Sequence, residues 1–229
     1  MKMKAVIFDI DDTLYPYAPC DAAGTENMMN VLSEISGHIY DEKEFTPLLS
    51  QAKDYVKKRT SETAACHNRV LYSQRLCEMT ECLSAENVLA LYNAYWDSFL
   101  EKMKLFDGAY ELLCGIKERG IKIGFCTDLT AHIQMRKLIR LGISDIADGI
   151  VTSEESGAEK PSEIPFGMIL EKLGVSASEA VMIGDDYKKD ILGAEAVGMK
   201  AIQFGNKHHH RICVSDYREL ADVLKGMME

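Results

Sequence analysis

Three carboxylates stand within four positions near the start of the chain, directly after a short apolar run. They are Asp9, Asp11 and Asp12 in the stretch KAVIFDIDDTLYPY, residues 4–17. In an extended segment residues i and i+2 project to the same side, so Asp9 and Asp11 can face one site while Asp12 points elsewhere. Crowded carboxylates disfavour one another's ionised form unless a cation offsets the repulsion. The pattern therefore predicts a cation beside Asp9 and Asp11.

Further reactive side chains follow three other apolar runs. Thr127 ends the run IKIGFCT and is followed by Asp128. Lys160 lies in the loop after GIVTS, and Asp185 and Asp186 follow AVMIG. If these runs are parallel strands, their carboxyl ends meet at one edge of the sheet, where ligands bind in doubly wound folds. We therefore expect these groups to gather around the first pair of carboxylates.

The types of these groups indicate phosphoryl chemistry. Hard carboxylate oxygens suit Mg²⁺, and the ion would join Lys160 and the Thr127 hydroxyl in a cationic cradle for a phosphoryl group. Asp9 is the expected nucleophile, which would form an aspartyl-phosphate intermediate. Asp11 is expected to protonate the leaving alkoxide and later to take the proton of the hydrolytic water. Asp185 would supply a third acidic group from another strand.

Apolar runs rich in β-branched residues alternate with helical patterns along most of the chain. The runs predict buried strands at residues 4–8, 121–127, 149–153, 180–184 and 200–204. The helical patterns lie at about 108–119, 131–141, 163–173, 188–197 and 217–227. This alternation predicts a parallel, doubly wound α/β sheet.

Residues 20–103 interrupt the alternation, because they contain amphipathic segments and no convincing strand. The clearest of these segments is a helical stripe of aromatic and aliphatic residues that follows Ser84 as its N-cap. The insertion is too long for an ordinary crossover between two strands. We therefore expect an α/β catalytic core formed by residues 1–17 and 104–229, with an inserted all-helical cap domain at 18–103.

The composition limits the classes of partner that the protein can have and the compartment in which we expect it. The 229 residues are 47% hydrophobic, and their formal net charge of -10 argues against a nucleic acid polymer as partner. No segment reaches the roughly 18 apolar residues of a membrane span, and the first apolar run is too short for a signal peptide. Seven cysteines without metal-finger spacing indicate reduced thiols. We expect a cytoplasmic protein that acts on a small molecule and not at a membrane; the sequence does not indicate an oligomeric state.

Four of these segments, in their order along the chain, resemble the motifs of the haloacid dehalogenase (HAD) superfamily. The segments are DIDDT followed by Leu14, Thr127 at a strand end, Lys160 with Pro161, and GDDYKKD. The resemblance implies a Rossmann-like core and a helical cap inserted between the first and second motifs. It also implies that Asp9 is both nucleophile and Mg²⁺ ligand.

Roles for the other site residues follow from the same resemblance. Asp11 would be the acid/base and would bind the metal through its carbonyl, while Thr127 and Lys160 would hold the phosphoryl oxygens. Asp185 and Asp186 would be metal ligands, although the position of Asp186 is often serine in relatives. Asp190 matches the second acid of GDxxxxD and would orient Lys160 or a metal-bound water.

The presence of Asp11 separates this sequence from true dehalogenases, which lack a carboxylate at that position, and so favours phosphate chemistry. The leading hypothesis is an Mg²⁺-dependent phosphatase that hydrolyses a small phosphomonoester, with sugar phosphates, nucleoside monophosphates and phosphoglycolate-like acids all compatible. A phosphomutase is a second enzymatic hypothesis, and a phospho-aspartate signalling or binding module is one from another class. Candidates in the cap for holding an anionic substrate tail are Arg59, His67, Arg69 and Arg75.

Overall fold

The computed structural model describes residues 3–60, 63–205 and 209–228. The chain forms two compact units. We call residues Met1–Pro16 with Lys104–Glu229 the core unit, and residues Tyr17–Met103 the helical unit. The seven cysteines are free thiols. None of the helices in the described part of the chain combines the length and the apolarity that a membrane span requires.

The core unit contains a six-stranded parallel sheet with strand order β3-β2-β1-β4-β5-β6. The strands are β1 Ala5–Phe8, β2 Lys122–Thr127, β3 Gly149–Thr152, β4 Ala180–Gly184, β5 Lys200–Phe204 and β6 Cys213–Val214. The predicted parallel sheet and its five long strands are confirmed, whereas the two-residue β6 carries no pattern in the sequence. Because β1 pairs with β2 on one side and β4 on the other, the strand order reverses at β1. Such a switch point is where doubly wound sheets bind their ligands.

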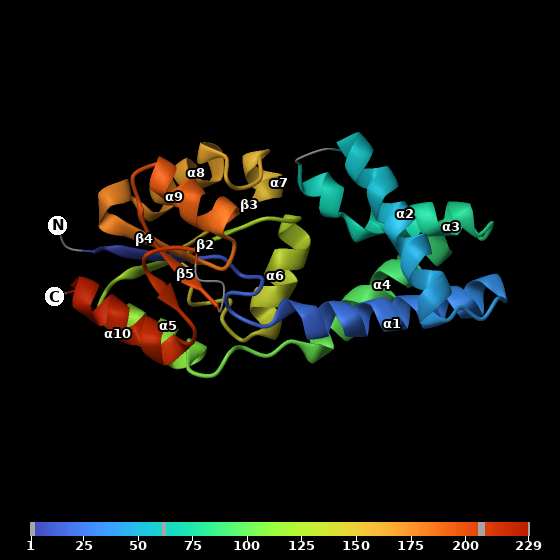
Figure 1. The fold of residues 1–229 in the computed structure, drawn as a ribbon, viewed down its shortest axis with the longest axis horizontal. Coiled ribbons are helices and arrows are strands. Elements are labelled where there is room, and N and C mark those ends of the chain that lie inside the picture. The colour runs from blue at the N-terminus through green and yellow to red at the C-terminus, as the bar shows by residue number, and fades with distance from the viewer. Residues whose placement is uncertain (1–2, 61–62, 206–208, 229) are drawn as a thin grey trace. The chain divides into compact units, whose positions relative to one another are not determined.

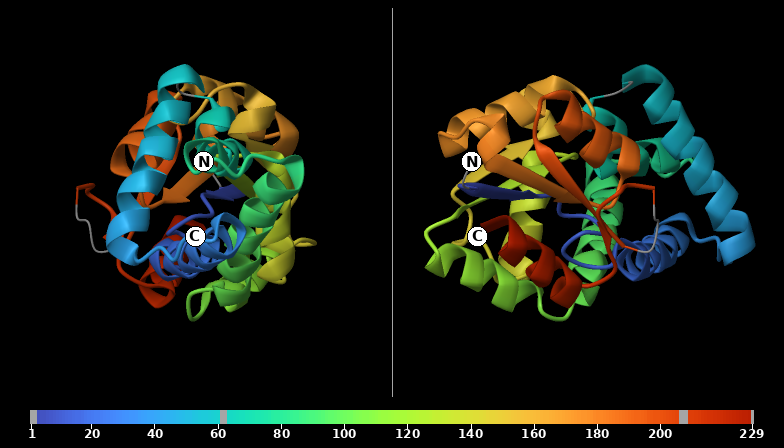
Figure 2. Two further views of the ribbon diagram at one scale, coloured as in Figure 1. Left: turned by 90° about the vertical axis from the view of Figure 1, so that its right-hand side faces the viewer. Right: turned by 60° about the vertical axis from the view of Figure 1, so that its left-hand side comes forward.

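Helices cover both faces of this sheet, with α8 and α9 on one face and α5 and α10 on the other (Figures 1 and 2). The helical elements of the core unit are α5 Ala109–Glu118, α6 Ala131–Arg140, α7 Ser153–Ser156, α8 Glu163–Leu173, η2 Ala177–Glu179, η3 Tyr187–Leu192, α9 Gly193–Ala196 and α10 Tyr217–Met228. Several boundaries differ from the sequence prediction by one residue, and one predicted helix is divided in two. The helix expected at 188–197 is the π-helical turn η3 followed by the short α9, and the strand expected to end at Ser153 ends one residue earlier, because α7 begins there.

The packing of α8 on the sheet explains a glycine inside a strand. Phe166, Ile169 and Leu173 of α8 are fully buried in a cluster with residues of β1, β3 and β4. A Cβ at Gly124 of β2 would lie 2.9 Å from Leu173 Cδ1, a distance that real Cβ contacts do not reach. Gly124 therefore lets α8 lie close to the strands whose ends carry the predicted site.

The helical unit contains no strand in its described residues and is built from four long helices and one short one. They are α1 Tyr17–Ser36, α2 Glu42–Thr60, η1 Ala64–His67, α3 Arg69–Met79 and α4 Ala85–Lys102. The Ser84 hydroxyl caps α4 by accepting from Asn87 N at 3.1 Å, as the sequence predicts. The buried stripe of α4 packs along α1. The two helices lie so close that a Cβ at Gly24 of α1 would lie 2.7 Å from Tyr95 O of α4. That this unit acts as a cap stays a prediction.

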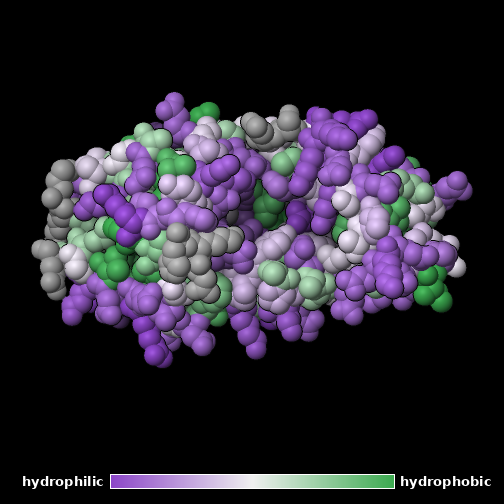
Figure 3. Space-filling view, in the orientation of Figure 1, coloured by the Kyte–Doolittle hydropathy of each residue, from purple (hydrophilic) through white to green (hydrophobic). Residues whose placement is uncertain are grey.

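On the face drawn in Figure 3 hydrophilic residues dominate, and apolar residues form small separate patches. Scattered apolar side chains of this kind are normal for a folded chain and mark no interface by themselves.

Candidate active site

The carboxyl end of β1 places Asp9 in a buried position between its two neighbouring strands. Asp9 N donates to Ile183 O at 2.9 Å, so β1 stays in register with β4 up to the carboxylate. The Asp9 residue is only 6% exposed. Asp11 is half-buried, and Asp12 is exposed with a φ of 56° in the left-handed region. The backbone therefore separates Asp12 from the pair, as the alternation of side chains predicts.

Lys160 joins two of the predicted catalytic carboxylates. Its Nζ atom lies 2.6 Å from Asp9 Oδ1, 2.6 Å from Asp190 Oδ1 and 3.0 Å from Cys126 O. These three acceptors satisfy the three N–H donors of the ammonium in a site where Lys160 is 3% exposed. Burial acts to lower the pKa of Lys160, but the charges of Asp190 and Asp9 hold that pKa well above its usual value. Lys160 is therefore a permanent cation at the centre of the site.

The carboxylates around Lys160 carry more negative charge than this one ammonium compensates. Burial, together with the charges of Asp190 and Asp11, raises the pKa of Asp9 to about 7 against the opposing effect of Lys160. Burial likewise raises the pKa of Asp190. Asp9, Asp185 and Asp190 offer carboxylate oxygens that all lie within 4.8 Å of one another. A set of hard oxygen donors with excess negative charge fits a divalent cation of the Mg²⁺ type.

Gly184, the last residue of β4, makes room for Asp190. A Cβ at position 184 would lie 2.3 Å from Asp190 Cγ, so that an alanine here would overlap the carboxylate. Asp190 is fixed further from η3, because Asp186 N donates to Asp190 Oδ2 at 3.0 Å and Asp190 N donates to Asp186 O at 2.8 Å. Within the segment GDDYKKD, the absence of a side chain at Gly184 therefore leaves the space that the Asp190 carboxylate occupies.

The structure gives Asp186 a different position from that of the other predicted metal ligands. Its exposed carboxylate accepts from Lys188 N at 2.9 Å and from Lys189 N at 3.0 Å, and so caps the first turn of η3. Among the described residues the carboxylate cluster contains neither Asp186 nor the side chain of Asp11. For Asp11 the expected ligand is the backbone carbonyl. The cluster is made of side-chain atoms, so it does not test that expectation.

Thr127 and Asp128, at the end of β2, are both held by residues that the sequence interpretation did not select. Gln134 Nε2 of α6 donates to Thr127 Oγ1 at 2.8 Å and to Asp128 O at 2.7 Å. The Asp128 carboxylate accepts from Lys160 N at 3.1 Å and from Lys189 Nζ at 2.7 Å. Asp128 thereby ties the loop of Lys160 to the end of β2 and to η3.

Asp11 is held by a second buried lysine, which the sequence interpretation also missed. Lys137 Nζ of α6 lies 2.6 Å from Asp11 Oδ1 and 2.8 Å from Asp11 Oδ2, and Tyr15 Oη donates to Asp11 Oδ1 at 2.5 Å. A signal for this lysine exists in the sequence. Lys137 lies four positions after Ile133 and four before Leu141, on the apolar face of the predicted helix.

The four cap candidates fall into different environments within the helical unit. Arg69 is buried, donates to Tyr17 Oη at 2.7 Å and to His67 O at 2.8 Å, and lies near three aromatic rings. Arg59 and Arg75 both stack on the Tyr55 ring, with centroid distances of 3.6 Å and 4.2 Å. These contacts of Arg69 all lie within its own unit.

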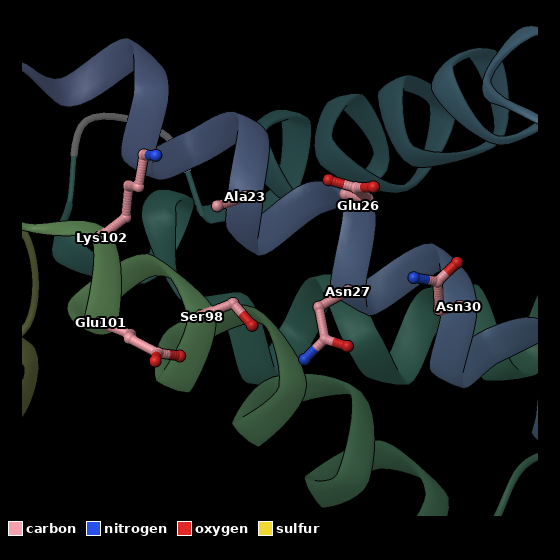
Figure 4. Close-up of a pocket in the computed structure, with 7 residues that line it drawn as sticks. All are labelled: Ala23, Glu26, Asn27, Asn30, Ser98, Glu101 and Lys102. Atoms are coloured by element: carbon pink, nitrogen blue, oxygen red, sulfur yellow. The ribbon is translucent and has the colours of Figure 1, made fainter.

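A polar groove of about 450 Å³ also lies in the helical unit, between α1 and α4 (Figure 4). Its lining residues are Ala23, Glu26, Asn27, Asn30, Ser98, Glu101 and Lys102. Asn27 Nδ2 donates to Ala94 O at 3.0 Å, which ties α1 to α4 beneath the groove. None of the predicted site residues lines this groove.

Comparison with known proteins identifies the family of the chain. A family profile described as haloacid dehalogenase-like hydrolase matches residues 3–198. A ribulose-1,5-bisphosphate 5-phosphatase of Halopiger xanaduensis is 42% identical over 95% of this chain and 89% of its own length. A glyceraldehyde 3-phosphate phosphatase of Methanopyrus kandleri is 32% identical over 88% of this chain and 83% of its own. The crystal structure of a HAD phosphatase from Thermococcus onnurineus superposes with a TM-score of 0.75 at 25% identity, covering 98% of this chain and 99% of that one.

Proposed function

The chain belongs to the haloacid dehalogenase-like hydrolases as a phosphoric monoester hydrolase, and from that premise we propose that it hydrolyses a small phosphorylated sugar through an aspartyl-phosphate on Asp9. The observation that carries the proposal is the contact of Lys160 Nζ with both Asp9 Oδ1 and Asp190 Oδ1, at 2.6 Å each. A buried cation fixed beside a buried carboxylate is suited to draw in a phosphoryl group next to the nucleophile.

In the first step an Asp9 carboxylate oxygen attacks phosphorus and the bond from phosphorus to the sugar oxygen breaks. Lys160 orients the Asp9 carboxylate through Oδ1 and offsets negative charge on the phosphoryl oxygens. The Thr127 hydroxyl, which accepts from Gln134 Nε2, would donate to a phosphoryl oxygen. Asp11, which must begin the cycle protonated, gives its proton to the departing sugar oxygen and is left as a carboxylate.

In the second step water attacks phosphorus of the aspartyl-phosphate and the bond from phosphorus to the Asp9 oxygen breaks. The Asp11 carboxylate takes the proton of that water, which returns both aspartates to their starting states. Asp11 suits this double role because it is half-buried, whereas Asp9 is almost fully buried.

We assign the cation site to Asp9, Asp185 and Asp190, with the Asp11 carbonyl as a further candidate ligand and Asp186 as a less favoured one. When bound there, Mg²⁺ would neutralise the carboxylates and bind a phosphoryl oxygen. The spacing of the three carboxylate oxygens supports this assignment.

The substrate class follows from the relatives and is also a proposal. The two relatives described above act, by their names, on ribulose 1,5-bisphosphate and on glyceraldehyde 3-phosphate. Both compounds are phosphorylated sugars, so we propose a substrate of this kind, with the helical unit as the cap domain that selects it.

The test is a panel of phosphorylated sugars, nucleotides and carboxylic acids incubated with the purified protein and Mg²⁺. Both released phosphate and isomerised sugar phosphate are measured, which separates a phosphatase from a phosphomutase. We expect phosphate release from a sugar phosphate, and its loss in Asp9→Asn, which keeps the shape of the side chain but removes the nucleophile. Undiminished hydrolysis by Asp9→Asn would refute the mechanism, and isomerisation without phosphate release would favour the mutase.

A further inference from the structure

The two aspartates at the end of β1 each have a buried lysine of their own. Lys160 contacts Asp9, and Lys137 contacts Asp11 through both carboxylate oxygens. Lys160 belongs to one of the four segments that resemble HAD motifs, whereas Lys137 belongs to none of them. Full burial of a lysine is rare unless its charge is paired, and Lys137 is 0% exposed. The position of this side chain therefore needs an explanation.

Helix α6 carries no predicted catalytic residue, yet its buried face holds two polar side chains. Gln134 and Lys137 stand three positions apart and so lie on the same side of the helix. Gln134 donates to Thr127 Oγ1, and Lys137 donates to Asp11. One helix thus holds a side chain from the end of β2 and another from the end of β1.

The contacts of Asp11 define the orientation of its carboxylate. Oδ1 accepts from both Lys137 and Tyr15, and Oδ2 accepts from Lys137. Lys137 and Tyr15 are fully buried, while the Asp11 side chain keeps 25% of its surface exposed. The donors therefore hold the carboxylate from the protein side and leave its remaining surface free for a reacting group.

An exposed pair in the same unit shows what a purely surface interaction looks like. Lys117 Nζ lies 2.7 Å from Asp148 Oδ1, but both side chains are about one third exposed. Such a pair contributes little to stability. The Lys137 pair differs because its lysine is wholly enclosed and its carboxylate is a predicted acid/base.

We propose that Lys137 is a positioning residue for proton transfer by Asp11: it fixes the carboxylate in the orientation from which Asp11 reaches the leaving oxygen and the attacking water. The proposal rests on the proposed function, since it gives Asp11 its role as acid/base. Tyr15 assists through its bond to Oδ1.

The experiment compares two substrates that differ in their need for a general acid. The alkoxide that leaves a sugar phosphate must be protonated, whereas the stable p-nitrophenolate leaves p-nitrophenyl phosphate without that help. The second step, in which Asp11 takes the proton of water, is common to both substrates, so the first step is measured alone in a single turnover. We expect Lys137→Met to lower the rate of that first step about 100-fold or more on the best sugar phosphate and less than about tenfold on p-nitrophenyl phosphate. Lys137→Arg should recover part of the loss, and Tyr15→Phe should give a smaller loss of the same selectivity.

Two controls separate positioning from folding. Lys117→Met removes a lysine from the exposed pair with Asp148 and should leave both activities unchanged. Thermal unfolding identifies any variant that fails to fold. If Lys137→Met fails to fold, the selectivity of Tyr15→Phe between the two substrates tests the proposal instead. In an Asp11→Asn background, Lys137→Met should cause no further loss, because a residue that acts through Asp11 has no effect once Asp11 cannot transfer a proton.

Equal losses of the first-step rate on both substrates, or losses that add in the double variant, would overturn the role of Lys137 while leaving the proposed function standing. A wild-type protein that releases phosphate from neither substrate with Mg²⁺ would overturn both. The two failures are therefore distinct.

Discussion

Lys160 Nζ lies 2.6 Å from Asp9 Oδ1, although 151 positions separate the two residues in the sequence. The same nitrogen lies 2.6 Å from Asp190 Oδ1. One ammonium thus holds the carboxylate that follows β1 and the carboxylate in the first turn of η3. Lys137 makes the corresponding contact with Asp11. Two separate lysines therefore offset part of the negative charge of the carboxylates in DIDD.

Lys160→Met should impair both activity and folding. The substitution leaves Asp9 and Asp190 buried without their cation, which costs about 3–5 kcal/mol for a broken buried pair. Phosphate release should fall by at least about 100-fold. Urea unfolding and a phosphate assay measure the two effects.

The matched control for Lys160 is Lys172→Met. Lys172 Nζ lies 2.6 Å from Glu155 Oε1 in an exposed pair of the same unit. Its loss should cost less than about 1 kcal/mol. An unfolding midpoint of Lys160→Met equal to that of Lys172→Met would contradict the central role given to Lys160.

Mg²⁺ alone should raise the melting temperature of the wild-type protein, and EDTA should reverse the rise. A ligand that binds only the folded state stabilises it by about 2.7 kcal/mol at 100 times its Kd. Asp185→Asn should abolish the rise, since Asp185 belongs to the carboxylate cluster. Asp186→Asn should retain it, because the Asp186 carboxylate caps η3. If Asp186→Asn abolished the Mg²⁺-induced rise in melting temperature and Asp185→Asn retained it, Asp186 would be the metal ligand in place of Asp185.

The sequence predicts the part of this site that depends on strand ends. Asp9, Thr127, Lys160 and Asp185 could be placed together because parallel strands deliver their carboxyl ends to one edge. The resemblance to the family motifs added Asp190. The fold class followed from the same alternation of strands and helices. These predictions needed only local patterns and the topology of a parallel sheet.

The supporting residues could not be predicted in this way. Gln134 and Lys137 lie on a helix between the motifs, and the apolar residues around Lys137 indicate its helix face but not the carboxylate that it contacts. Their burial depends on partners at positions 127 and 11, which are remote in the sequence. The two residues of β6 fail for another reason, since a strand so short has no periodicity to detect.

Gly184→Ala should reduce phosphate release, and it should reduce it more than Gly167→Ala does. The added methyl would lie 2.3 Å from Asp190 Cγ and must displace that carboxylate from Lys160. Overpacking of this kind costs about 1–3 kcal/mol. Gly167→Ala is the control, because a Cβ there meets nothing within 4 Å and alanine favours its helix, α8. Identical activity in the two variants would show that Asp190 tolerates displacement.

Arg69→Met should destabilise the helical unit. The substitution removes donors to Tyr17 Oη and His67 O and takes a guanidinium from among aromatic rings, which we expect to cost about 2–4 kcal/mol. The protein has one tryptophan, Trp96, whose ring lies 5.4 Å from Arg69 Cζ. The unfolding of this unit can therefore be followed by intrinsic fluorescence.

Arg59→Met serves as the control for Arg69, since Arg59 is exposed and stacks only on Tyr55 among the aromatic rings. Its fluorescence transition should stay within about 0.5 kcal/mol of the wild type, as for most surface substitutions. The two interpretations of Arg69 predict different observables. A structural arginine shifts the fluorescence transition and leaves KM unchanged under conditions where the variant is folded, whereas an arginine that holds the substrate tail raises KM and leaves the transition in place. The buried contacts of Arg69 favour the first outcome.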